Sequence, residues 1–335
     1  MVVEEEMRTV RFRGYGEPAE VLRLERVAVP DPPRGRIRAV VHACGLNPAD
    51  WALCRGLFAG RLPRGIGLEV SGVVDAVGEG VADVAVGDPV MGTPDWSREA
   101  SAGASDRAIL EHRTRIPAGL GPLQGAALPM AAETAYRSLE SLGMAAGQVL
   151  MVHGAGTTVG FAAVQLALMR GVRVVATAGE TYAGRLRDLG ASVTEYGDGM
   201  VERVRDLVGG SPDFILDTAP PGGVLPDLVR IAGGDPGLVL AITDFESARA
   251  LGVRDGIGEG GSLRYDMLPE FARWAADGRL TVPIARTFTL EDWDQARVIS
   301  ESGKARGKLL LLPGGQAAGA WIRVAPPNLE RPPVP

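Results

Sequence analysis

Three glycines set close together, Gly154, Gly156 and Gly160, lie between two apolar runs and constrain the fold more than any other feature. The run before them, residues 149–152, is β-branched or large and apolar, and a second β-prone run follows at 172–177. Between them, residues 161–170 are rich in Ala, Leu, Val and Met and contain no Gly or Pro. The order of strand, glycine turn, helix and strand predicts the βαβ unit of a parallel sheet.

The glycine turn is also a candidate phosphate site. A helix that starts directly after a parallel strand leaves its first amides unpaired, and these amides and the helix dipole attract a phosphate. The predicted pyrophosphate contacts are the whole loop: Gly154, Ala155, Gly156, Thr157, Thr158, Val159 and Gly160. The spacing G-x-G-x-x-x-G is one residue longer than the usual dinucleotide fingerprint. A glycine turn that binds no ligand is therefore the alternative.

The end of the second predicted strand bears on the type of cofactor. A chain that binds NAD usually places Asp or Glu there to hold the ribose diol. This chain has Ala178 and Gly179 at that point, with Glu180 one step further. Arg185 could meet a 2′-phosphate, which favours NADPH. The alternatives are that Glu180 holds the ribose and that Arg185 is a solvated helix charge.

Length and composition exclude several other classes. A chain of 335 residues suggests about two domains, and 46% hydrophobic with 23% charged residues is ordinary for a globular protein. A net charge of −6 gives no reason to expect nucleic-acid or membrane-surface partners. No run approaches the length of a membrane span, and the acidic N-terminus lacks the apolar segment of a secretory signal. With two cysteines and three histidines, we expect neither a disulfide framework nor a metal site. The same cysteine usage predicts a reducing, cytoplasmic setting.

The texture of the sequence changes near residue 126. Before it, short β-prone runs alternate with Gly and Pro turns, which predicts an irregular antiparallel, barrel-like domain. After it, five strand-like runs alternate with helical stretches, which predicts a doubly wound parallel sheet. A helical stretch at 267–276 is followed by strand-like runs at 281–290 and 308–314 around a helix that begins near 290. The Gly/Ala- and Pro-rich tail from 314 onward is expected to be poorly ordered or to lie on the surface.

Several motifs together resemble the medium-chain dehydrogenase/reductase superfamily, within it the zinc-free quinone oxidoreductase-like branch. They are GLNPADW, GLEVSGVVDAVGEGV, ALPMAAETAYRSL, the glycine loop, FILDTA and FTLEDWDQARVISESGKARGKLLL, in the order of the family. The resemblance implies an α/β fold, in which a GroES-like β-rich catalytic domain accompanies a Rossmann doubly wound parallel sheet. It places the catalytic domain at 1–125 and 267–335 and the Rossmann NADP(H)-binding domain at 126–266.

The resemblance also implies roles for single residues. Asn47 and Thr134 would sit beside the nicotinamide, and the glycine loop would hold the pyrophosphate. Arg185 and Tyr196 fall near positions that contact the adenosine phosphate. Residues after the ends of later strands would line the ribose and the carboxamide: Thr218, Ala241, Ile242 and Thr243. Glu69 would organise the cleft or form a buried ion pair.

The chain departs from the family pattern at two places. Zinc-dependent relatives have Cys where Asn47 stands and His where Leu68 stands, and the structural zinc lobe is absent. A catalytic zinc needs three protein ligands, so metal-assisted chemistry is not expected, and Cys44 and Cys54 are interpreted as small buried residues. Many relatives have Tyr where Phe58 stands, which puts the enoyl-thioester mechanism in doubt.

The remaining chemistry is hydride transfer to an acceptor that is already activated, an α,β-unsaturated carbonyl compound or a quinone. Asn47 is the candidate that positions the acceptor oxygen, with Thr134 on the carboxamide and water as the proton source. Asp50 is a weaker catalytic candidate, and its alternative role is the cap of a helix. His42 and His153 are interpreted as packed imidazoles. Trp51, Phe58 and residues 92–105 could shape the substrate pocket, with ordinary packing as the alternative.

Three hypotheses for the function stay open. The first is an NADPH-dependent, zinc-independent quinone or enoyl (alkene) reductase that acts on a small molecule in the cytoplasm. The second is a specialised natural-product biosynthetic reductase or cyclase of the same fold, suggested by Phe58 and the loop at 92–105. The third is a non-catalytic NADPH-binding sensor or scaffold. A homodimer is expected, paired through an edge strand predicted near Gly261–Tyr265.

Overall fold

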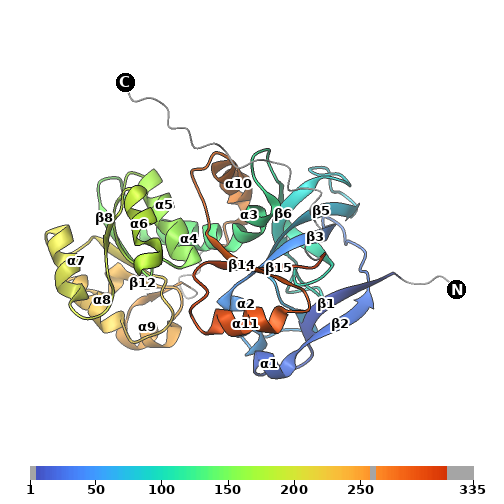
Figure 1. The fold of residues 1–335 in the computed structure, drawn as a ribbon, viewed down its shortest axis with the longest axis horizontal. Helices are drawn as coiled ribbons and strands as arrows, with labels where there is room; N and C mark the ends of the chain where they lie inside the picture. Colours follow the sequence, from blue (N-terminus) through green and yellow to red (C-terminus); the bar gives the residue numbers. More distant parts are fainter. Residues whose placement is uncertain (1–4, 257–261, 315–335) are drawn as a thin grey trace.

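The computed structural model describes residues 5–256 and 262–314, and these residues form three sheets. Figure 1 shows the parallel sheet and its helices on one side of the molecule and the β-rich part on the other. The C-terminal tail that was predicted to be poorly ordered lies outside the described residues beyond Gly314. Among the described residues, no helix is both long enough and apolar enough to span a membrane.

The β-rich part is a sheet that closes on itself, and all its pairings are antiparallel except that of β14 with β15. Its strand order is β14-β15-β3-β5-β6-β7, and β3 also pairs with β7, so four strands form a barrel. A small sheet, β2-β1-β4, lies beside it. The bounds are β1 (Glu6–Phe12), β2 (Leu22–Ala28), β3 (Ile37–Leu46), β4 (Arg64–Gly65), β5 (Glu69–Val77), β6 (Pro89–Pro94), β7 (Arg107–Arg115), β14 (Ile284–Thr289) and β15 (Lys308–Leu312). The barrel-like domain predicted from the sequence is confirmed, and two strands from the C-terminal part complete it.

The parallel sheet has the order β10-β9-β8-β11-β12-β13, and every pairing in it is parallel. The direction of winding reverses between β8 and β11, which is the place where ligands bind in doubly wound sheets. The predicted Rossmann sheet is thus confirmed. Its strands are β8 (Val149–His153), β9 (Arg173–Thr177), β10 (Ser192–Thr194), β11 (Phe214–Asp217), β12 (Val239–Ala241) and β13 (Arg254–Asp255).

Helices cover both faces of the parallel sheet and connect it to the barrel (Figure 1). They are α4 (Pro129–Leu142), α5 (Thr158–Met169), α6 (Glu180–Asp188), α7 (Met200–Val208), α8 (Leu225–Ile231), α9 (Phe245–Leu251) and α10 (Leu268–Ala276). Near the barrel lie α1 (Pro18–Val21), α2 (Pro48–Cys54), α3 (Pro122–Ala127) and α11 (Trp293–Glu301). Helix α5 begins three residues before the predicted start at 161, because Thr157 caps it. The limits of the two domains remain a prediction.

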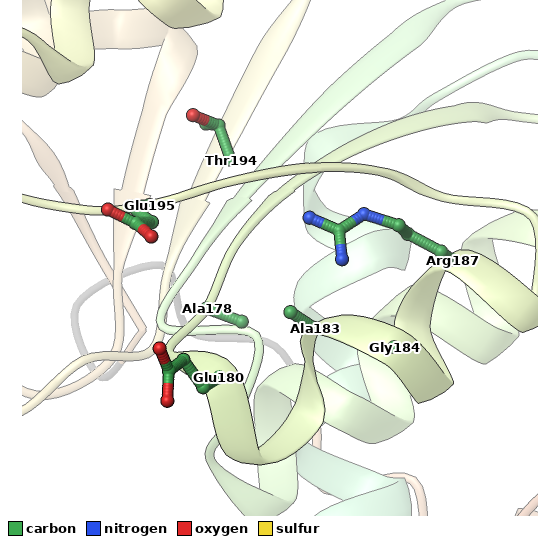
Figure 2. A pocket seen from close by; sticks show the side chains of 7 residues that line it. All are labelled: Ala178, Glu180, Ala183, Gly184, Arg187, Thr194 and Glu195. Carbon is green, nitrogen blue, oxygen red and sulfur yellow. The ribbon is translucent and has the colours of Figure 1, made fainter.

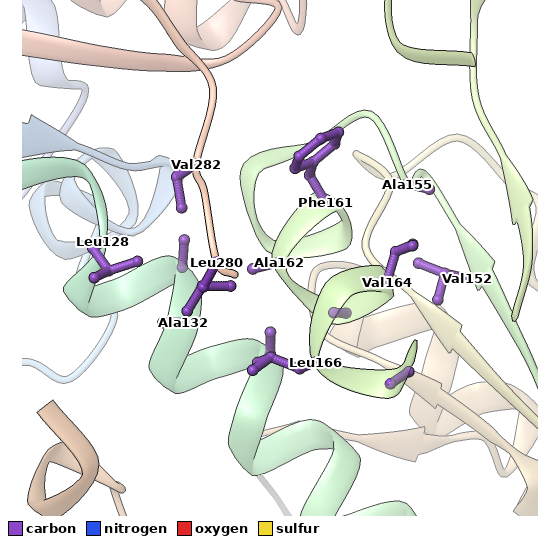
Figure 3. Close-up of a cluster of buried hydrophobic side chains, with 14 of the residues drawn as sticks. Leu128, Ala132, Val152, Ala155, Phe161, Ala162, Val164, Leu166, Leu280 and Val282 are labelled. Carbon is purple, nitrogen blue, oxygen red and sulfur yellow. The ribbon is translucent and has the colours of Figure 1, made fainter. Parts of the chain in front are cut away.

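The largest apolar core joins the two parts of the molecule. Figure 3 shows Leu128 and Ala132 of the α3–α4 region facing Ala162 and Leu166 of α5, with Leu280 between them. Leu280 belongs to the segment that runs from α10 to β14, so the returning chain packs on the Rossmann helices before it reenters the barrel. Burial of these side chains stabilises the joint by roughly 1.5–3 kcal/mol for each large side chain.

The edge strand predicted near Gly261–Tyr265 is wrong for the residues that the structure describes. Residues 262–264 have no regular structure, and Tyr265 begins a 3-10 helix, η2 (Tyr265–Met267); Gly261 lies outside the described residues. The backbone N–H of Arg264 donates to the carboxylate of Glu133 at 3.0 Å instead of to a strand. The described edge strand on this side is β13.

Candidate functional site

The glycine loop connects β8 to α5 and is held tightly against the end of β11. Gly154 has a left-handed φ of +74°, and a Cβ added there would lie 2.6 Å from the backbone N of Ala219. A Cβ on Gly160 would lie 2.5 Å from the carbonyl oxygen of Gly154. Both distances are too short for any side chain, so these two positions require glycine.

The start of α5 has the geometry of an anion site. Thr157 is the N-cap, and its hydroxyl accepts the N–H of Gly160 at 3.0 Å. Among the described residues, no group accepts a hydrogen bond from the backbone N–H of Gly156, Thr158 or Val159. Unpaired amides at a helix N-terminus, on the switch point of the sheet, bind phosphates. The predicted pyrophosphate loop therefore fits the group it was predicted to hold.

The groups beneath the loop are neutral. The Thr218 hydroxyl lies 2.9 Å from the carbonyl oxygens of both His153 and Gly154, and the Thr157 hydroxyl donates to it at 3.0 Å. His153 places Nδ1 2.8 Å from the Thr177 hydroxyl, and burial lowers the pKa of His153 to about 4. The interpretation of His153 as a packed, neutral imidazole is confirmed. Thr218 already uses its one hydroxyl hydrogen within the loop, so its role toward a ribose stays a prediction.

Further residues on the predicted cofactor path follow β12. The N–H of Ile242 donates to the backbone carbonyl oxygen of Asp217, and the Thr243 hydroxyl donates to the carbonyl oxygen of Ala219 at 2.5 Å. Ala241 is buried, whereas Ile242 and Thr243 are half-buried at the carboxyl edge of the sheet. These contacts tie the end of β12 to the end of β11, beside the glycine loop.

A hollow of about 290 Å³ lies between α6 and the end of β10. The residues that line it are Ala178, Glu180, Ala183, Gly184, Arg187, Thr194 and Glu195. Figure 2 shows the Arg187 guanidinium on one side of the hollow and the carboxylates of Glu180 and Glu195 on the other. The hollow follows directly on β9, where the sequence analysis expected the adenosine end of the cofactor.

The two residues predicted for the adenosine phosphate lie elsewhere on the same region. The guanidinium carbon of Arg185 lies 5.0 Å above the ring of Phe161. Tyr196 is 61% exposed, with its hydroxyl 3.5 Å from a Cβ position on Gly179. Arg187, which the sequence analysis did not select, lines the hollow. Helical periodicity could have found it, since residues two apart on a helix point in different directions.

A buried cluster of charges lies on the barrel side. Lys308 places Nζ 2.5 Å from Glu69 Oε1 and 2.6 Å from Asn47 Oδ1, while Asn47 Nδ2 donates to the same Glu69 oxygen at 3.0 Å. The exposed fractions are 1% for Lys308, 0% for Glu69 and 7% for Asn47. The three residues come from β15, β5 and the N-cap of α2. The ion-pair interpretation of Glu69 is confirmed; Lys308 was missed, although a lysine at the start of an apolar strand is an unusual feature.

Glu69 also reaches the helix that carries Thr134. Its Oε2 accepts the N–H of Met130 in the first turn of α4 at 2.8 Å. A carboxylate at a helix N-terminus is favoured by the unpaired amides and the helix dipole. Thr134 lies one turn further along α4 and is half-buried. Glu69 thus connects Asn47 and Thr134, the two residues predicted beside the nicotinamide.

Asp50 forms the predicted helix cap. Its two carboxylate oxygens accept the N–H of Asn47 at 2.7 Å and the N–H of Gly67 at 2.6 Å. Burial raises the pKa of Asp50 to about 7, against the effect of those two hydrogen bonds. Because the cap uses both oxygens, a catalytic role for Asp50 stays only a prediction.

The two aromatic residues predicted for the substrate pocket differ in environment. Trp51 is 2% exposed and donates its indole N–H to the Ser300 hydroxyl at 2.8 Å, which favours the packing alternative. Phe58 is 54% exposed, has a left-handed φ of +52° and lies with its ring 6.2 Å from that of Trp96. Phe58 is therefore the aromatic side chain that a ligand could contact.

The described residues contain no group of three or more His, Cys, Asp or Glu side chains arranged to hold a metal ion. Cys44 and Cys54 are buried free thiols, as expected, and burial raises the pKa of both. Asn47, at the position where zinc-dependent relatives have Cys, offers an amide oxygen that the ammonium of Lys308 already contacts at 2.6 Å.

Comparisons with known proteins agree with this architecture. Residues 33–135 match the family described as Alcohol dehydrogenase GroES-like domain, and residues 178–311 match the family described as Zinc-binding dehydrogenase. The Quinone oxidoreductase of Homo sapiens is 37% identical over 179 residues, which cover 52% of this chain and 53% of that protein. Erythronolide synthase EryA2 of Saccharopolyspora erythraea is 35% identical over 192 residues, 55% of this chain and 5% of that protein. The chain thus spans about half the length of the curated quinone oxidoreductases it matches.

A solved structure covers more of the chain. The quinone oxidoreductase from Coxiella burnetii matches 92% of this chain and 99% of that one, at 25% identity and a TM-score of 0.74. The GroES-like barrel, the Rossmann sheet and these likenesses lead to one assignment: the chain belongs to the medium-chain dehydrogenase/reductase superfamily, with quinone oxidoreductases among its relatives.

Proposed function

We propose that this protein is a zinc-independent, NADPH-dependent oxidoreductase that reduces an activated C=C bond or a quinone by hydride transfer. The observation that carries the proposal is the glycine loop, with three unpaired backbone amides at the switch point of a parallel sheet. Quinone oxidoreductases among the relatives support the choice of acceptor. Enoyl reduction is the same chemistry on a conjugated carbonyl compound.

When bound, a reduced nicotinamide supplies a hydride to the acceptor. For an enone, the hydride adds to the β-carbon, the C=C electron pair moves toward the carbonyl oxygen, and water protonates the α-carbon. Asn47 uses one Nδ2 hydrogen toward Glu69, and its second Nδ2 hydrogen is free to donate to the acceptor oxygen. A fixed donor stabilises the charge that collects on that oxygen. Lys308 holds Oδ1 of Asn47, so the amide cannot flip.

The residues at the predicted nicotinamide end support zinc independence. Asn47 and Leu68 occupy the two positions at which zinc-dependent relatives have ligands, and neither is a good zinc ligand. The Lys308 ammonium, 2.6 Å from Asn47 Oδ1, would also repel a divalent cation. We expect the purified protein to keep its activity after dialysis against a chelator, and a metal assay to detect no zinc in the dialysed protein. A loss of activity that zinc restores would contradict this part of the proposal.

The NADPH preference is assigned to Arg187 together with Arg185. Arg187 lines the hollow after β9, and no acidic residue stands at Ala178 or Gly179 to hold a ribose diol. We expect the Arg187→Met variant to bind NADPH about tenfold more weakly, with NADH binding changed little, which corresponds to about 1.4 kcal/mol. Arg173→Met is the matched control, since Arg173 is exposed at the opposite end of β9. Equal losses for both cofactors would contradict the assignment.

The central test is oxidation of NADPH, followed by its absorbance, with a panel of quinones and enones. We expect turnover with at least one acceptor of each class and a stoichiometric reduced product. Tight NADPH binding with no turnover of any acceptor would favour the non-catalytic sensor instead. Turnover confined to elaborate polyketide-like acceptors would favour the biosynthetic reductase or cyclase, a candidate that the likeness to erythronolide synthase supports.

We also propose that the protein acts in the cytoplasm as a homodimer. β13 is the described edge strand of the Rossmann sheet, and we place the contact with a second copy at this edge. Light scattering at working concentration checks the state: twice the chain mass is expected, and a monomer would contradict it.

A further inference from the structure

Arg64 is a buried cation without a described counter-ion. It is 2% exposed, and no carboxylate among the described residues forms an ion pair with it. Its guanidinium carbon lies 4.9 Å above the ring of Trp96. Because a cation–π contact recovers only part of the hydration that a buried charge loses, this arginine calls for an anion.

The free edge of the guanidinium defines the shape of that anion. Nη1 donates to the carbonyl oxygen of Phe58 at 2.7 Å. Nε has no hydrogen-bond partner, whereas the phenol oxygen of Tyr15 also interacts with the guanidinium. Nε and Nη2 lie on one edge and present two parallel N–H groups, the fork that a carboxylate accepts with both oxygens.

The surroundings of Arg64 belong to the substrate side of the molecule. Phe58, Trp96 and Arg64 form one contact group, and Phe58 is its exposed member, with a left-handed φ. The exposed Tyr15 borders the group: the pKa of its phenol is lowered first by the hydrogen bond with Gly60 and then by Arg64. The surface therefore lies close to the free edge.

Arg64 also lies close to the Asn47 cluster along the chain. Gly67 lies three positions further along the chain, and its N–H donates to Asp50 at 2.6 Å. Three positions of extended chain span at most about 11 Å. A substrate of moderate size could therefore contact both Arg64 and Asn47.

We propose that Arg64 binds a carboxylate of the acceptor substrate, so that the preferred acceptors are enones or quinones with an acidic side chain. This inference rests on the proposed reductase function and narrows its substrate class. The carboxylate reaches the Nε–Nη2 edge when the Phe58 side chain moves aside. Arg64 acts in specificity and takes no part in the transfer of hydride or proton.

The experiment uses acetylacrylic acid and its methyl ester, two enones of which only the acid carries a negative charge. Because the ester group also makes the C=C bond more electrophilic, the acid-to-ester ratio of each variant is compared with that of the wild type. We expect the wild-type protein to prefer the acid by about 10- to 100-fold in kcat/KM, the range of a hydrogen-bonded charge. Arg64→Met is expected to abolish the preference through the acid alone, with the ester rate unchanged. Arg61→Met is the matched control, since Arg61 is exposed on the same loop, and it should keep the preference.

Two further measurements separate this inference from the proposed function. The Arg64→Lys variant keeps a cation but loses the fork, so it should fold and still lose most of the preference. Thermal unfolding with acetylacrylate should raise the Tm of the wild type and not that of Arg64→Met, even if neither enone is turned over. Turnover of the ester with no preference for the acid, or an equal Tm shift in both proteins, would overturn the carboxylate site and leave the reductase proposal standing. Equal losses on acid and ester would reveal a structural arginine.

Discussion

The glycine loop and the Asn47 cluster are built on opposite principles. The side chains that hold the loop by hydrogen bonds are neutral, among them the hydroxyls of Thr157 and Thr218 and the imidazole of His153, and the loop presents bare backbone amides. The Asn47 cluster is fully buried and is held by the ion pair of Lys308 with Glu69. Because no charged side chain holds the loop, the positive potential of its amides remains available to a phosphate. In the cluster, the charges of Lys308 and Glu69 neutralise each other inside the protein and orient the side-chain amide of Asn47. The loop is therefore suited to binding an anion, and the cluster to fixing a geometry.

The cluster should be the more fragile of the two regions. Lys308→Met removes the ammonium and leaves Glu69 as a carboxylate that is buried with no cation beside it. We expect a loss of about 3–5 kcal/mol in the free energy of unfolding, measured by urea denaturation. Lys304→Met is the control, because Lys304 is exposed four residues away on the same segment. A cost below about 1 kcal/mol, similar to that of an exposed ion pair, would show that the Glu69 charge is balanced elsewhere.

The glycine loop should be sensitive to added side-chain volume and not to the loss of a charge. Gly160→Ala puts a methyl group 2.5 Å from the carbonyl oxygen of Gly154, so the loop must shift. We expect a loss of about 1–3 kcal/mol in stability, as for other overpacked sites, and at least a tenfold weaker binding of NADPH. Binding is measured by fluorescence titration of the reduced nicotinamide.

Gly121→Ala is the matched control for that change. Gly121 is the N-cap residue of α3, and a Cβ added there meets nothing within 4 Å. Alanine at this cap should cost less than about 1 kcal/mol and leave the glycine loop intact. Similar effects of the two substitutions on NADPH binding would mean that the close approach of Gly160 is not what shapes the loop.

The same contrast explains what could be predicted from the sequence. The loop is local: its glycines, its strand and its helix follow one another within twenty-five residues of sequence, so spacing alone indicates it. The barrel was predicted as a class, and the cap by Asp50 was found because a helix cap is also a local signal, whereas Asn47 was selected through the family resemblance. The glycine loop and the helix cap both depend on residues that are close together in the chain, so their patterns can be seen in the sequence.

What could not be predicted depends on contacts between distant segments. Lys308 and Glu69 are 239 positions apart, and no periodicity relates them. The strand predicted near Gly261–Tyr265 failed because a side chain, Glu133, accepts the N–H of Arg264. Arg187 was missed, because the direction of a helical side chain decides which residue of α6 lines the hollow. The predicted role of Arg185, whose guanidinium lies over the ring of Phe161, stays a prediction.

The loop region contains one carboxylate whose titration should be visible. Burial raises the pKa of Asp217 to about 7 from its ordinary value of 3.8, while its hydrogen bond from Ala219 acts in the opposite direction. The folded protein therefore holds this proton more tightly than the unfolded chain, and stability falls as the pH rises from about 4 to about 7. Asp217 should contribute a slope of at most about 1.4 kcal/mol per pH unit.

Asp217→Asn should remove that contribution. Urea denaturation at several pH values across this window should give a shallower decline of stability for the variant than for the wild type. Burial raises the pKa of Asp50 to about 7 as well, so a residual slope of the same sign is expected in the variant. Identical slopes in the two proteins would show that Asp217 is hydrated in solution.

The smallest expected effect concerns the contact between the two regions. Tyr182 of α6 packs its ring 5.7 Å from that of Phe161 and lies 3.3 Å from a Cβ position on Gly156. Its hydroxyl donates to the carbonyl oxygen of Arg306, two residues before Lys308. The side chain of Tyr182 therefore lies beside the glycine loop and contacts the segment that precedes the buried Lys308. Tyr182→Phe keeps the ring and removes the hydrogen bond, so we expect a loss of about 0.5–1.5 kcal/mol in stability.

If this contact couples the regions, the loss from Tyr182→Phe should shrink once Lys308 has been replaced, because Lys308→Met already loosens the segment that accepts the bond. A double-mutant cycle of the free energies of unfolding measures this, and a coupling above about 0.5 kcal/mol is expected for groups that share one strand connection. Additive losses would mean that the loop and the cluster are independent devices. The properties of the glycine loop and of the Asn47 cluster would then be set within each region alone, with no energetic coupling between the two.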